Sequence, residues 1–319
     1  MAVSRMNNLA KEKIPFFFLI DFEMLKPLVI PLDGLNDHEI FFDFQGFTNK
    51  KQSSQKNRVV NLKKYPIPFS AYEPDFNRIK AHLTRGDSYL INLTYQTPIE
   101  LDSSLRDVFR LANAPYRLLF KNDFVCFSPE SFIKIKDGVI STYPMKGTIN
   151  ASQPRALEKI IHDKKELAEH VTVVDLLRND LSKVAEGVTV PKFRFPTFIK
   201  SNHGKLIQLS SLVQGHLKQG YEECLGDVIF SLLPAGSVSG APKTRTTDII
   251  KAVERGDRGY YSGVAGVFDG HSLDSFVLIR FVERIDGKYF FRSGGGITAN
   301  SSAESEYQEM IDKIYVPIA

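Results

Sequence analysis

Residues 260–298 read YYSGVAGVFDGHSLDSFVLIRFVERIDGKYFFRSGGGIT, and this stretch decides the fold class. Its β-branched and aromatic residues fall into three short runs, which Asp-Gly steps at 269–270 and 286–287 separate. Asp-Gly between such runs is typical of tight hairpin turns. The stretch therefore predicts three antiparallel strands joined by hairpins.

The rest of the chain extends this pattern. Further strands are predicted at 116–128, 131–142 and 204–217, and a long helix is predicted from 155 to 184, where apolar residues recur at helical spacing. A last helix is predicted at 302–315. Adjacent strands with helices gathered between them indicate the α+β class. No linker separates two independent domains.

Composition limits the kinds of function. The chain has 319 residues, of which 43% are hydrophobic and 24% charged, so it can bury a large core. A formal charge of +4, from 41 basic and 37 acidic residues, is too small and too interspersed for a nucleic-acid-binding stripe. It suits an anionic small molecule equally well.

The cellular setting is predicted from two further features. The apolar run near the N-terminus is short and is interrupted by Asp21 and Glu23, and no run reaches the length of a membrane span. The two cysteines, Cys126 and Cys224, form no CxxC motif, so neither a disulfide framework nor a zinc site is expected. We expect a cytoplasmic protein that binds neither membrane nor nucleic acid.

Two predicted helices each carry a pair of glutamates three residues apart. The pairs are Glu166 with Glu169, and Glu306 with Glu309. Residues at i and i+3 share a helix face, so each pair directs two carboxylates the same way. If the faces meet, a divalent cation is needed to offset the repulsion, and an all-oxygen set suits Mg²⁺. Two solvated helix faces are the alternative.

Two glycine-containing segments are candidate anion sites. Gly294 to Gly296 follow a predicted strand, and their backbone amides can approach an anion closely, although a simple turn fits the run equally well. The segment GSVSGAPKT at 236–244 is no Walker loop, because Pro242 interrupts the pattern. A helix N-terminus behind it still makes an anion-binding turn plausible.

These segments together resemble one enzyme family, the chorismate-utilising enzymes. That family includes anthranilate, isochorismate, salicylate and aminodeoxychorismate synthases. The resemblance runs from about residue 75 to the C-terminus and rests on GDSYLINLT, SPESF, PMKGT, KELAEHVTVVDLLRNDL, LLPAGSVSGAPKTR, RGYYSGVAG, SFVLIR, GGGITANSSAESEYQE and the trailing Lys313, in that order.

The resemblance implies a fold and a domain plan. The fold is two antiparallel sheets packed face to face with helices outside, and the substrate is chorismate bound with Mg²⁺. Residues 71–319 would form the chorismate-binding catalytic core. Residues 1–70 would be an abbreviated, β-rich N-terminal part of the same domain, without the signature of tryptophan-regulated members.

Site residues follow from the motif positions. Glu169 and Glu309 would bind the metal directly, and Glu166 and Glu306 would lie close by or act through water. The remaining positions implied to bind substrate are Gly147, Thr148, Gln208, Ser237, Val238, Ser239, Tyr260, Arg280, Gly294, Gly295, Gly296 and Lys313. Among them, Arg280, Lys313, Tyr260 and the backbone of Gly294 to Gly296 would hold one substrate carboxylate, to which the Arg280 guanidinium offers bidentate geometry.

Lys146, in the PMKGT motif, indicates the branch of the family. Anthranilate synthases resemble this chain but have alanine at that position, whereas lysine is similar to component I of aminodeoxychorismate synthase. There the lysine is thought to attack ring carbon C2 while the C4 hydroxyl leaves. Burial near cations would lower the pKa of such an amine toward the neutral state that attack requires. Glu130 matches the family's general acid.

One position departs from the family pattern. The family usually has histidine where Gln208 stands, and that histidine is associated with members that eliminate pyruvate. Glutamine is compatible with retention of the enolpyruvyl group, although aminodeoxychorismate synthases also carry the histidine. His170 and His203 receive no role.

The resulting prediction is a Mg²⁺-dependent aminodeoxychorismate synthase component I, acting toward p-aminobenzoate and folate. Neither cysteine has the context of a glutaminase nucleophile, so ammonia would come from solution or from a separate glutamine amidotransferase subunit. Anthranilate or isochorismate synthesis on the same fold is the nearest alternative. A chorismate-binding or glutaminase-anchoring protein without catalysis, and a basic nucleic-acid binder, are the alternatives from other classes.

Overall fold

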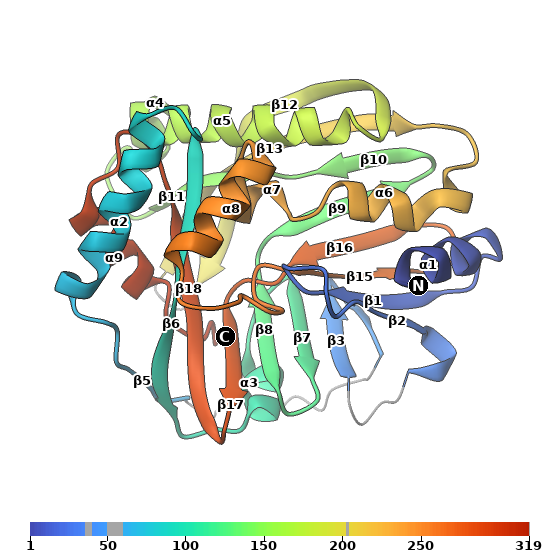
Figure 1. Ribbon diagram of the computed structural model, residues 1–319, viewed down its shortest axis with the longest axis horizontal. Coiled ribbons are helices and arrows are strands. Elements are labelled where there is room, and N and C mark those ends of the chain that lie inside the picture. Colours follow the sequence, from blue (N-terminus) through green and yellow to red (C-terminus); the bar gives the residue numbers. More distant parts are fainter. Residues whose placement is uncertain (36–39, 50–59, 202–203, 319) are drawn as a thin grey trace. The chain divides into compact units, whose positions relative to one another are not determined.

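A computed structural model describes residues 1–35, 40–49, 60–201 and 204–318 (Figure 1). The chain forms two units, each built from three separate segments. Unit 1 comprises residues 1–35, 130–238 and 263–277, and unit 2 comprises residues 36–129, 239–262 and 278–319. Each unit contains one antiparallel sheet of nine strands, which confirms the predicted class of two antiparallel sheets with helices. The functional division at residue 70 stays a prediction.

The sheet of unit 1 has the order β11-β13-β10-β9-β16-β15-β1-β2, and β12 pairs with β13 outside this path. The five residues of β1 are all buried, as expected for a strand that is apolar on both faces. The strands are β1 (Phe16–Ile20), β2 (Leu28–Pro31), β9 (Ser131–Lys136), β10 (Val139–Thr142), β11 (Met145–Asn150), β12 (Ala185–Ser201), β13 (Gly204–Leu217), β15 (Val264–Phe268) and β16 (Leu273–Val277).

The helices of unit 1 correct one prediction. The helix predicted across 155–184 is two helices, because Asp163 takes an extended conformation and its side chain accepts a hydrogen bond from Glu166 N at 2.9 Å, beginning a new helix. The second of them, α5, packs on β11, β12 and β13. The elements are α1 (Ala2–Lys11), η1 (Leu32–Gly34), α4 (Ala156–His162), α5 (Lys164–Leu181), η2 (Tyr221–Cys224), α6 (Leu225–Ser231) and the short α7 (Gly236–Ser239), whose last residue belongs to unit 2.

The sheet of unit 2 has the order β14-β6-β18-β17-β8-β7-β3-β4, and β5 pairs with β6. Its longest pairing joins β6 to β18. The strands are β3 (Ile40–Phe44), β4 (Phe47–Thr48), β5 (Leu62–Lys64), β6 (Leu90–Leu101), β7 (Tyr116–Phe120), β8 (Phe124–Ser128), β14 (Gly240–Ala241), β17 (Phe281–Ile285) and β18 (Lys288–Ile297). The helices are α2 (Phe69–Thr84), α3 (Leu105–Leu111), α8 (Lys243–Val253) and α9 (Ala303–Asp312).

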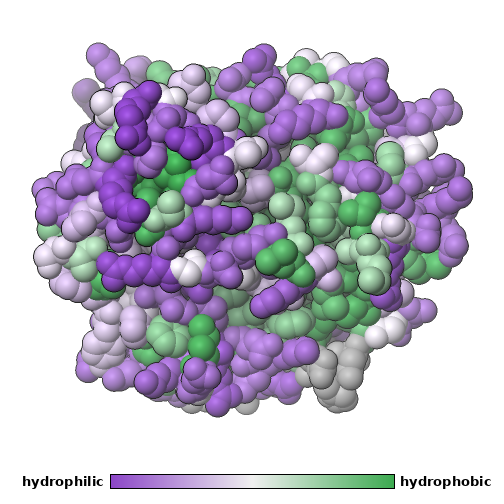
Figure 2. Space-filling view, in the orientation of Figure 1, coloured by the Kyte–Doolittle hydropathy of each residue, from purple (hydrophilic) through white to green (hydrophobic). Residues whose placement is uncertain are grey.

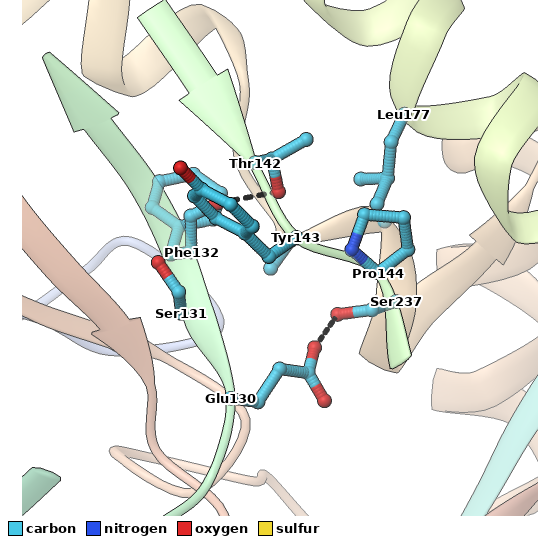
Figure 3. A pocket seen from close by; sticks show the side chains of 10 residues that line it. Glu130, Ser131, Phe132, Thr142, Tyr143, Pro144, Leu177 and Ser237 are labelled. Carbon is cyan, nitrogen blue, oxygen red and sulfur yellow. Dashed lines mark hydrogen bonds between the residues drawn. The ribbon is translucent and has the colours of Figure 1, made fainter. Parts of the chain in front are cut away.

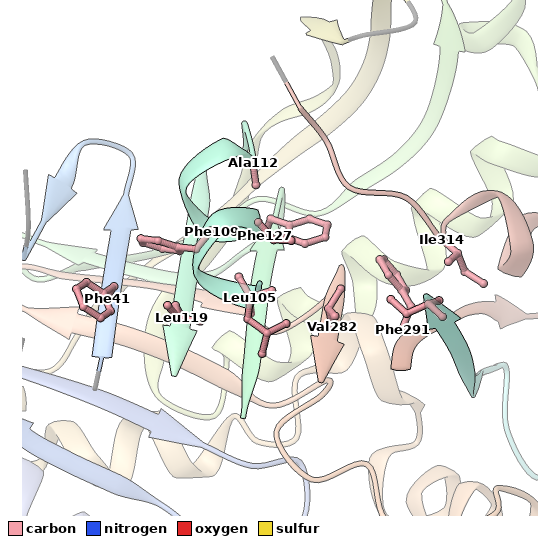
Figure 4. Packing of buried hydrophobic residues seen from close by; sticks show 12 residues of the cluster. Phe41, Leu105, Phe109, Ala112, Leu119, Phe127, Val282, Phe291 and Ile314 are labelled. Carbon is pink, nitrogen blue, oxygen red and sulfur yellow. The ribbon is translucent and has the colours of Figure 1, made fainter. Parts of the chain in front are cut away.

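One core of unit 2 lies beneath α3. Leu105 and Phe109 of this helix pack with residues of β7, β8, β17 and β18 (Figure 4). Ser104 caps the helix by accepting a hydrogen bond from Asp107 N at 3.1 Å. Burial of this apolar helix face holds α3 on the sheet that carries the glycine-rich segment.

The opening stretch contains a second correction. SFVLIRFVE was predicted as one strand, but it forms the end of β16 in unit 1 and the start of β17 in unit 2. Arg280 interrupts the strand with φ +56°, in the left-handed region that non-glycine residues adopt infrequently. One apolar run therefore supplies strands to both sheets.

The surface in view is mainly hydrophilic, with smaller hydrophobic patches between the charged side chains (Figure 2). In the part of the chain that the structure describes, no helix has the length and apolar character needed to cross a membrane.

Candidate active site

A pocket in unit 1 contains two of the predicted site residues. Glu130 precedes β9, and Ser237 lies in α7. The Ser237 hydroxyl donates a hydrogen bond to the Glu130 carboxylate (Figure 3). The Glu130 carbonyl also accepts from Val277 N at 3.1 Å, so both its main chain and its side chain are held. The pocket has about 230 Å³ of empty space, part of it open to solvent, and Tyr143 and Leu177 also line it.

The turn before Ser237 requires a glycine. A Cβ atom on Gly236 would lie 3.0 Å from the Asp180 carboxylate and 3.0 Å from a Leu176 methyl group. Real Cβ atoms rarely approach other atoms that closely. Gly236 therefore allows α5 to pack tightly against the turn that positions Ser237, while Val238, the next residue, is buried.

Lys146 lies in a β-bulge of β11. Met145 pairs with Ser210 and Thr148 pairs with Gln208, so Lys146 and Gly147 together face the single residue between those partners on β13. A bulge of this kind changes the direction of the side chains on the longer strand. Lys146 is half-buried.

Gly147 brings the first acidic pair close to the bulge. Its φ of +86° favours glycine, and a Cβ atom there would lie 3.2 Å from Glu166 Oε2. Glu166 and Glu169 are both half-buried on α5, and Glu169 Oε1 is 3.7 Å from Lys165 Nζ. Lys146 and the Glu166–Glu169 pair are thus neighbours in unit 1.

The predicted glycine run of unit 2 is neither a turn nor a free nest. Gly294, Gly295 and Gly296 lie within β18 and pair with Thr94, Leu93 and Asn92 of β6. A Cβ atom on Gly294 would lie 2.1 Å from the Leu93 carbonyl, so no other residue fits without movement of the strand. The described pairing of β18 with β17 ends at Arg292, so in this region the glycines pair with β6 alone.

The second acidic pair lies over these glycines. From a Cβ position on Gly295, Glu306 Oε2 is 3.2 Å away, Glu309 Oε1 is 3.7 Å and Lys313 Nζ is 3.7 Å. Lys313 Nζ is also 2.7 Å from Glu309 Oε1 and donates to the Gly294 carbonyl at 2.8 Å. Glu306 is only 3% exposed. Two carboxylates and one ammonium group therefore converge on one glycine.

A buried tyrosine that was not predicted lies near this pair, and it belongs to none of the motifs. Tyr72 of α2 is 2% exposed, and its ring centroid is 5.3 Å from that of Tyr307. Burial raises the pKa of Tyr72, and the charges of Glu306 and Glu309 raise it further, so its hydroxyl stays protonated near the carboxylates.

The structure separates Tyr260 from Tyr261. The Tyr260 ring packs against Phe120 and Phe124, at centroid distances of 5.6 and 5.5 Å. Tyr261 is 4% exposed, and burial raises its pKa to about 12, although the charge of Arg258 opposes the shift. Tyr261, which was not predicted, is therefore buried among charged groups of unit 2.

Arg280 is fixed by its surroundings in unit 2. Its guanidinium donates to the Lys313 carbonyl at 2.8 Å and lies 4.9 Å from the Tyr315 ring centroid. Ser239, another predicted site residue, is fully buried. A Cβ atom on Gly240, which follows it, would lie 1.9 Å from the Leu90 carbonyl. The two halves of the GSVSG segment thus serve different units, with Ser237 in unit 1 and Ser239 in unit 2.

A buried ion pair supports the glycine strand from behind. Arg258, 2% exposed, bonds both oxygens of Glu254, at 2.9 and 2.6 Å. Glu254 also accepts from Thr94 N at 2.8 Å, and Thr94 is the β6 partner of Gly294. A fully bonded pair of this type holds the end of α8 against β6.

Magnesium was expected at the four glutamates. They fall into two pairs, one in each unit, and within the described residues no three His, Cys, Asp or Glu side chains form a metal-binding group. The donor atoms are carboxylate oxygens, which Mg²⁺ prefers, and each pair is placed where a glycine leaves room beside it. The donor chemistry of the two pairs fits this ion.

Comparison with known proteins identifies the family. Residues 35–319 match the chorismate binding enzymes. The chain belongs to this family. This chain is 48% identical to an uncharacterized PabA-like protein of Haemophilus influenzae, over 99% of this chain and 96% of that protein.

Two relatives from Bacillus subtilis carry different activities in their names. The identity is 32% to aminodeoxychorismate synthase component 1, over 82% of this chain and 58% of the relative. It is 31% to anthranilate synthase component 1, over 95% of this chain and 59% of the relative. The fold of a putative 2,3-dihydroxybenzoate-specific isochorismate synthase from Bacillus anthracis matches with a TM-score of 0.72 at 20% identity, covering 97% of this chain and 84% of that one.

Proposed function

We propose that this chorismate-binding enzyme is component I of a Mg²⁺-dependent aminodeoxychorismate synthase, which converts chorismate and ammonia into 4-amino-4-deoxychorismate. The observation that carries the proposal is Lys146, a lysine held in a bulge beside Glu166. Identities of 32% and 31% to the two Bacillus relatives do not separate the products, so the proposal rests on the residue type at position 146.

Lys146 and Glu130 would carry out the covalent step. The Lys146 amine, in its neutral form, attacks ring carbon C2, the two conjugated ring double bonds shift, and the C4–O bond breaks. Glu130 gives its proton to the departing hydroxyl, which leaves as water. Because Ser237 donates to Glu130, it fixes the orientation of that carboxyl group.

The second step would return the enzyme to its starting state. Ammonia attacks C4, the two double bonds shift back, and the C2–N bond breaks, so that Lys146 leaves as the neutral amine. The new ammonium group loses one proton, and Glu130 regains the one it gave in the first step. The sum is chorismate plus ammonia giving aminodeoxychorismate plus water, and two displacements retain the configuration at C4.

Residues of unit 2 would bind the substrate's charges. Arg280, Lys313 and the β18 glycine amides would hold a carboxylate, with Tyr260 beside it. Glu169 and Glu309, with Glu166 and Glu306, would hold Mg²⁺. When bound, Mg²⁺ supplies positive charge that neutralises substrate carboxylate and orients it.

The cysteines support an external source of ammonia. A glutaminase nucleophile needs a thiolate, but burial raises the pKa of Cys126 well above its usual value and also raises that of Cys224. We therefore propose that ammonia reaches the enzyme from a separate glutamine amidotransferase subunit or from ammonium in solution, and that the setting is p-aminobenzoate and folate synthesis.

Product analysis tests the proposal. The purified chain is incubated with chorismate, MgCl₂ and an ammonium salt, and the products are separated by chromatography with mass detection. Aminodeoxychorismate from the native chain, and its loss in Lys146→Ala, are the expected results. Anthranilate or isochorismate as the product, or normal aminodeoxychorismate formation by Lys146→Ala, would overturn it.

A further inference from the structure

The bulge at Lys146 raises the question of what fixes its backbone. Two residues of β11 face one of β13, so Lys146 and Gly147 stand outside the regular ladder pairs. A bulged backbone needs other polar partners to hold one conformation. On one side, Ser211 N donates to the carbonyl of Pro144 at 3.0 Å, two residues before Lys146.

His170 of α5 lies next to this bulge. It is fully buried, and its Nε2 is 2.6 Å from Ser211 Oγ. The ring edge of Phe193 covers it at a centroid distance of 5.5 Å and an interplanar angle of 82°. Ser211 Oγ also accepts from Arg194 N at 2.9 Å, so one hydroxyl joins β12, β13 and α5.

The other ring nitrogen of His170 makes no hydrogen bond. Nδ1 is buried and has no hydrogen-bond partner in the described ranges. Burial lowers the pKa of His170 to about 4, and the charge of Arg194 adds to this shift. A neutral imidazole is therefore held where α5 packs on β11 and β13, through its contact with Ser211.

We propose that His170 and Ser211 brace the bulge and thereby aim the Lys146 amine, which makes His170 a positioning residue for the covalent step. The inference rests on the proposed function of Lys146. The brace links helix α5, which also carries Glu166 and Glu169, to the strand that carries the lysine. A displacement of about 1 Å at a reacting group can lower a rate on the order of 100-fold, so small changes in the brace are measurable.

The test compares three substitutions. His170→Leu removes both ring nitrogens, His170→Gln keeps polar atoms, and Ser211→Ala removes one hydroxyl. We expect kcat for aminodeoxychorismate to fall about 10- to 100-fold in His170→Leu, with the KM for chorismate changed less than about twofold, and partial retention in His170→Gln. His162→Leu, on the exposed end of α4, is the matched control and should keep native kcat.

A second readout does not depend on turnover. Pyridoxal 5′-phosphate followed by borohydride labels lysine amines, and peptide mass spectrometry gives the labelling rate at Lys146. We expect the rate at Lys146 to change several-fold in His170→Leu and Ser211→Ala but not in His162→Leu. If His170→Leu does not fold, Ser211→Ala and His170→Gln give the same readouts.

The outcomes distinguish the two proposals. Native kcat and native Lys146 labelling in a folded His170→Leu or Ser211→Ala variant would overturn the brace, while an inactive Lys146→Ala would leave the proposed function intact. An active Lys146→Ala would overturn the proposed function, and unchanged labelling in the brace variants would then overturn the brace separately.

Discussion

The two units each place a glutamate pair beside a strand glycine, but they do so differently. In unit 1, Gly147 lies in a bulge with φ +86°, and Glu169 Oε1 is 3.7 Å from Nζ of the exposed Lys165. In unit 2, Gly295 lies in a regular ladder, Glu306 is 3% exposed, and Lys313 is 2.7 Å from Glu309. The pair in unit 1 is half-buried beside a glycine with positive φ, whereas in unit 2 Glu306 is buried, Glu309 is exposed, and Lys313 compensates the charge of Glu309 at closer range.

The largest effect is expected from removing one charge of each pair. Glu169→Gln and Glu309→Gln should lower chorismate turnover at least about 100-fold at low Mg²⁺ or raise the Mg²⁺ requirement, since each loses an anionic ligand. Turnover against Mg²⁺ concentration and calorimetric Mg²⁺ binding measure this. The exposed Glu304→Gln on the same helix should behave as native. Native Mg²⁺ dependence in either variant would remove that glutamate from the metal site.

The two lysines give the next comparison. Lys313→Met should lower kcat/KM for chorismate about 10- to 100-fold, because Lys313 holds both Glu309 and the Gly294 carbonyl. Lys165→Met should change it less than about twofold, because its side chain is 44% exposed and its ion pair is weak. Equal losses of kcat/KM in the two variants would show that the two lysines contribute equally to their glutamate pairs.

Alanine at each glycine tests the difference in backbone strain. Gly147→Ala should lower the free energy of unfolding by about 1–2 kcal/mol, because alanine is strained at positive φ. Gly295→Ala has no such strain, and only the Glu306 carboxylate must shift, so we expect a smaller loss. Urea unfolding of both variants provides the measurement. A larger loss in Gly295→Ala would reverse the comparison.

The smallest effect is expected at Tyr72. Tyr72→Phe removes the hydroxyl near Glu306 and Glu309 and should raise the Mg²⁺ concentration for half-maximal activity by up to about tenfold, as other outer partners of metal ligands do. The exposed Tyr65→Phe is the control. An unchanged Mg²⁺ response with native stability would show that the hydroxyl plays no part at the acidic pair.

The sequence predicted β13, β18 and α9, and the helical region that contains α5, but it predicted no strand where β11 carries Lys146. Three further features depended on tertiary structure. The bulge at Lys146 exists only because β11 pairs out of register with β13. Arg280 breaks an apolar run whose pattern alone reads as one strand. Tyr260 packs on Phe120 and Phe124, which lie far from it in the sequence. His203 lies outside the described residues.

His170 illustrates the same limit from the other side. Its motif position gave it no role, because a helical histidine beside two glutamates has several possible neighbours. Only the packing of α5 on β11 and β13 brings it to Ser211, beside the strand that carries Lys146. A contact between segments that are distant in the sequence, such as that of His170 with Ser211, cannot be predicted from local sequence patterns.

The passage of one apolar run from β16 to β17 also has a consequence for how the chain is made. Strand β1 pairs with residues 264–268, and β6 pairs with residues 289–297, so both sheets await segments near the C-terminus. Such pairings are distant in sequence and form slowly. During synthesis, β1 can pair with β2 and β6 with β5, but the other edge of each strand must stay unpaired until residues 264–297 have left the ribosome.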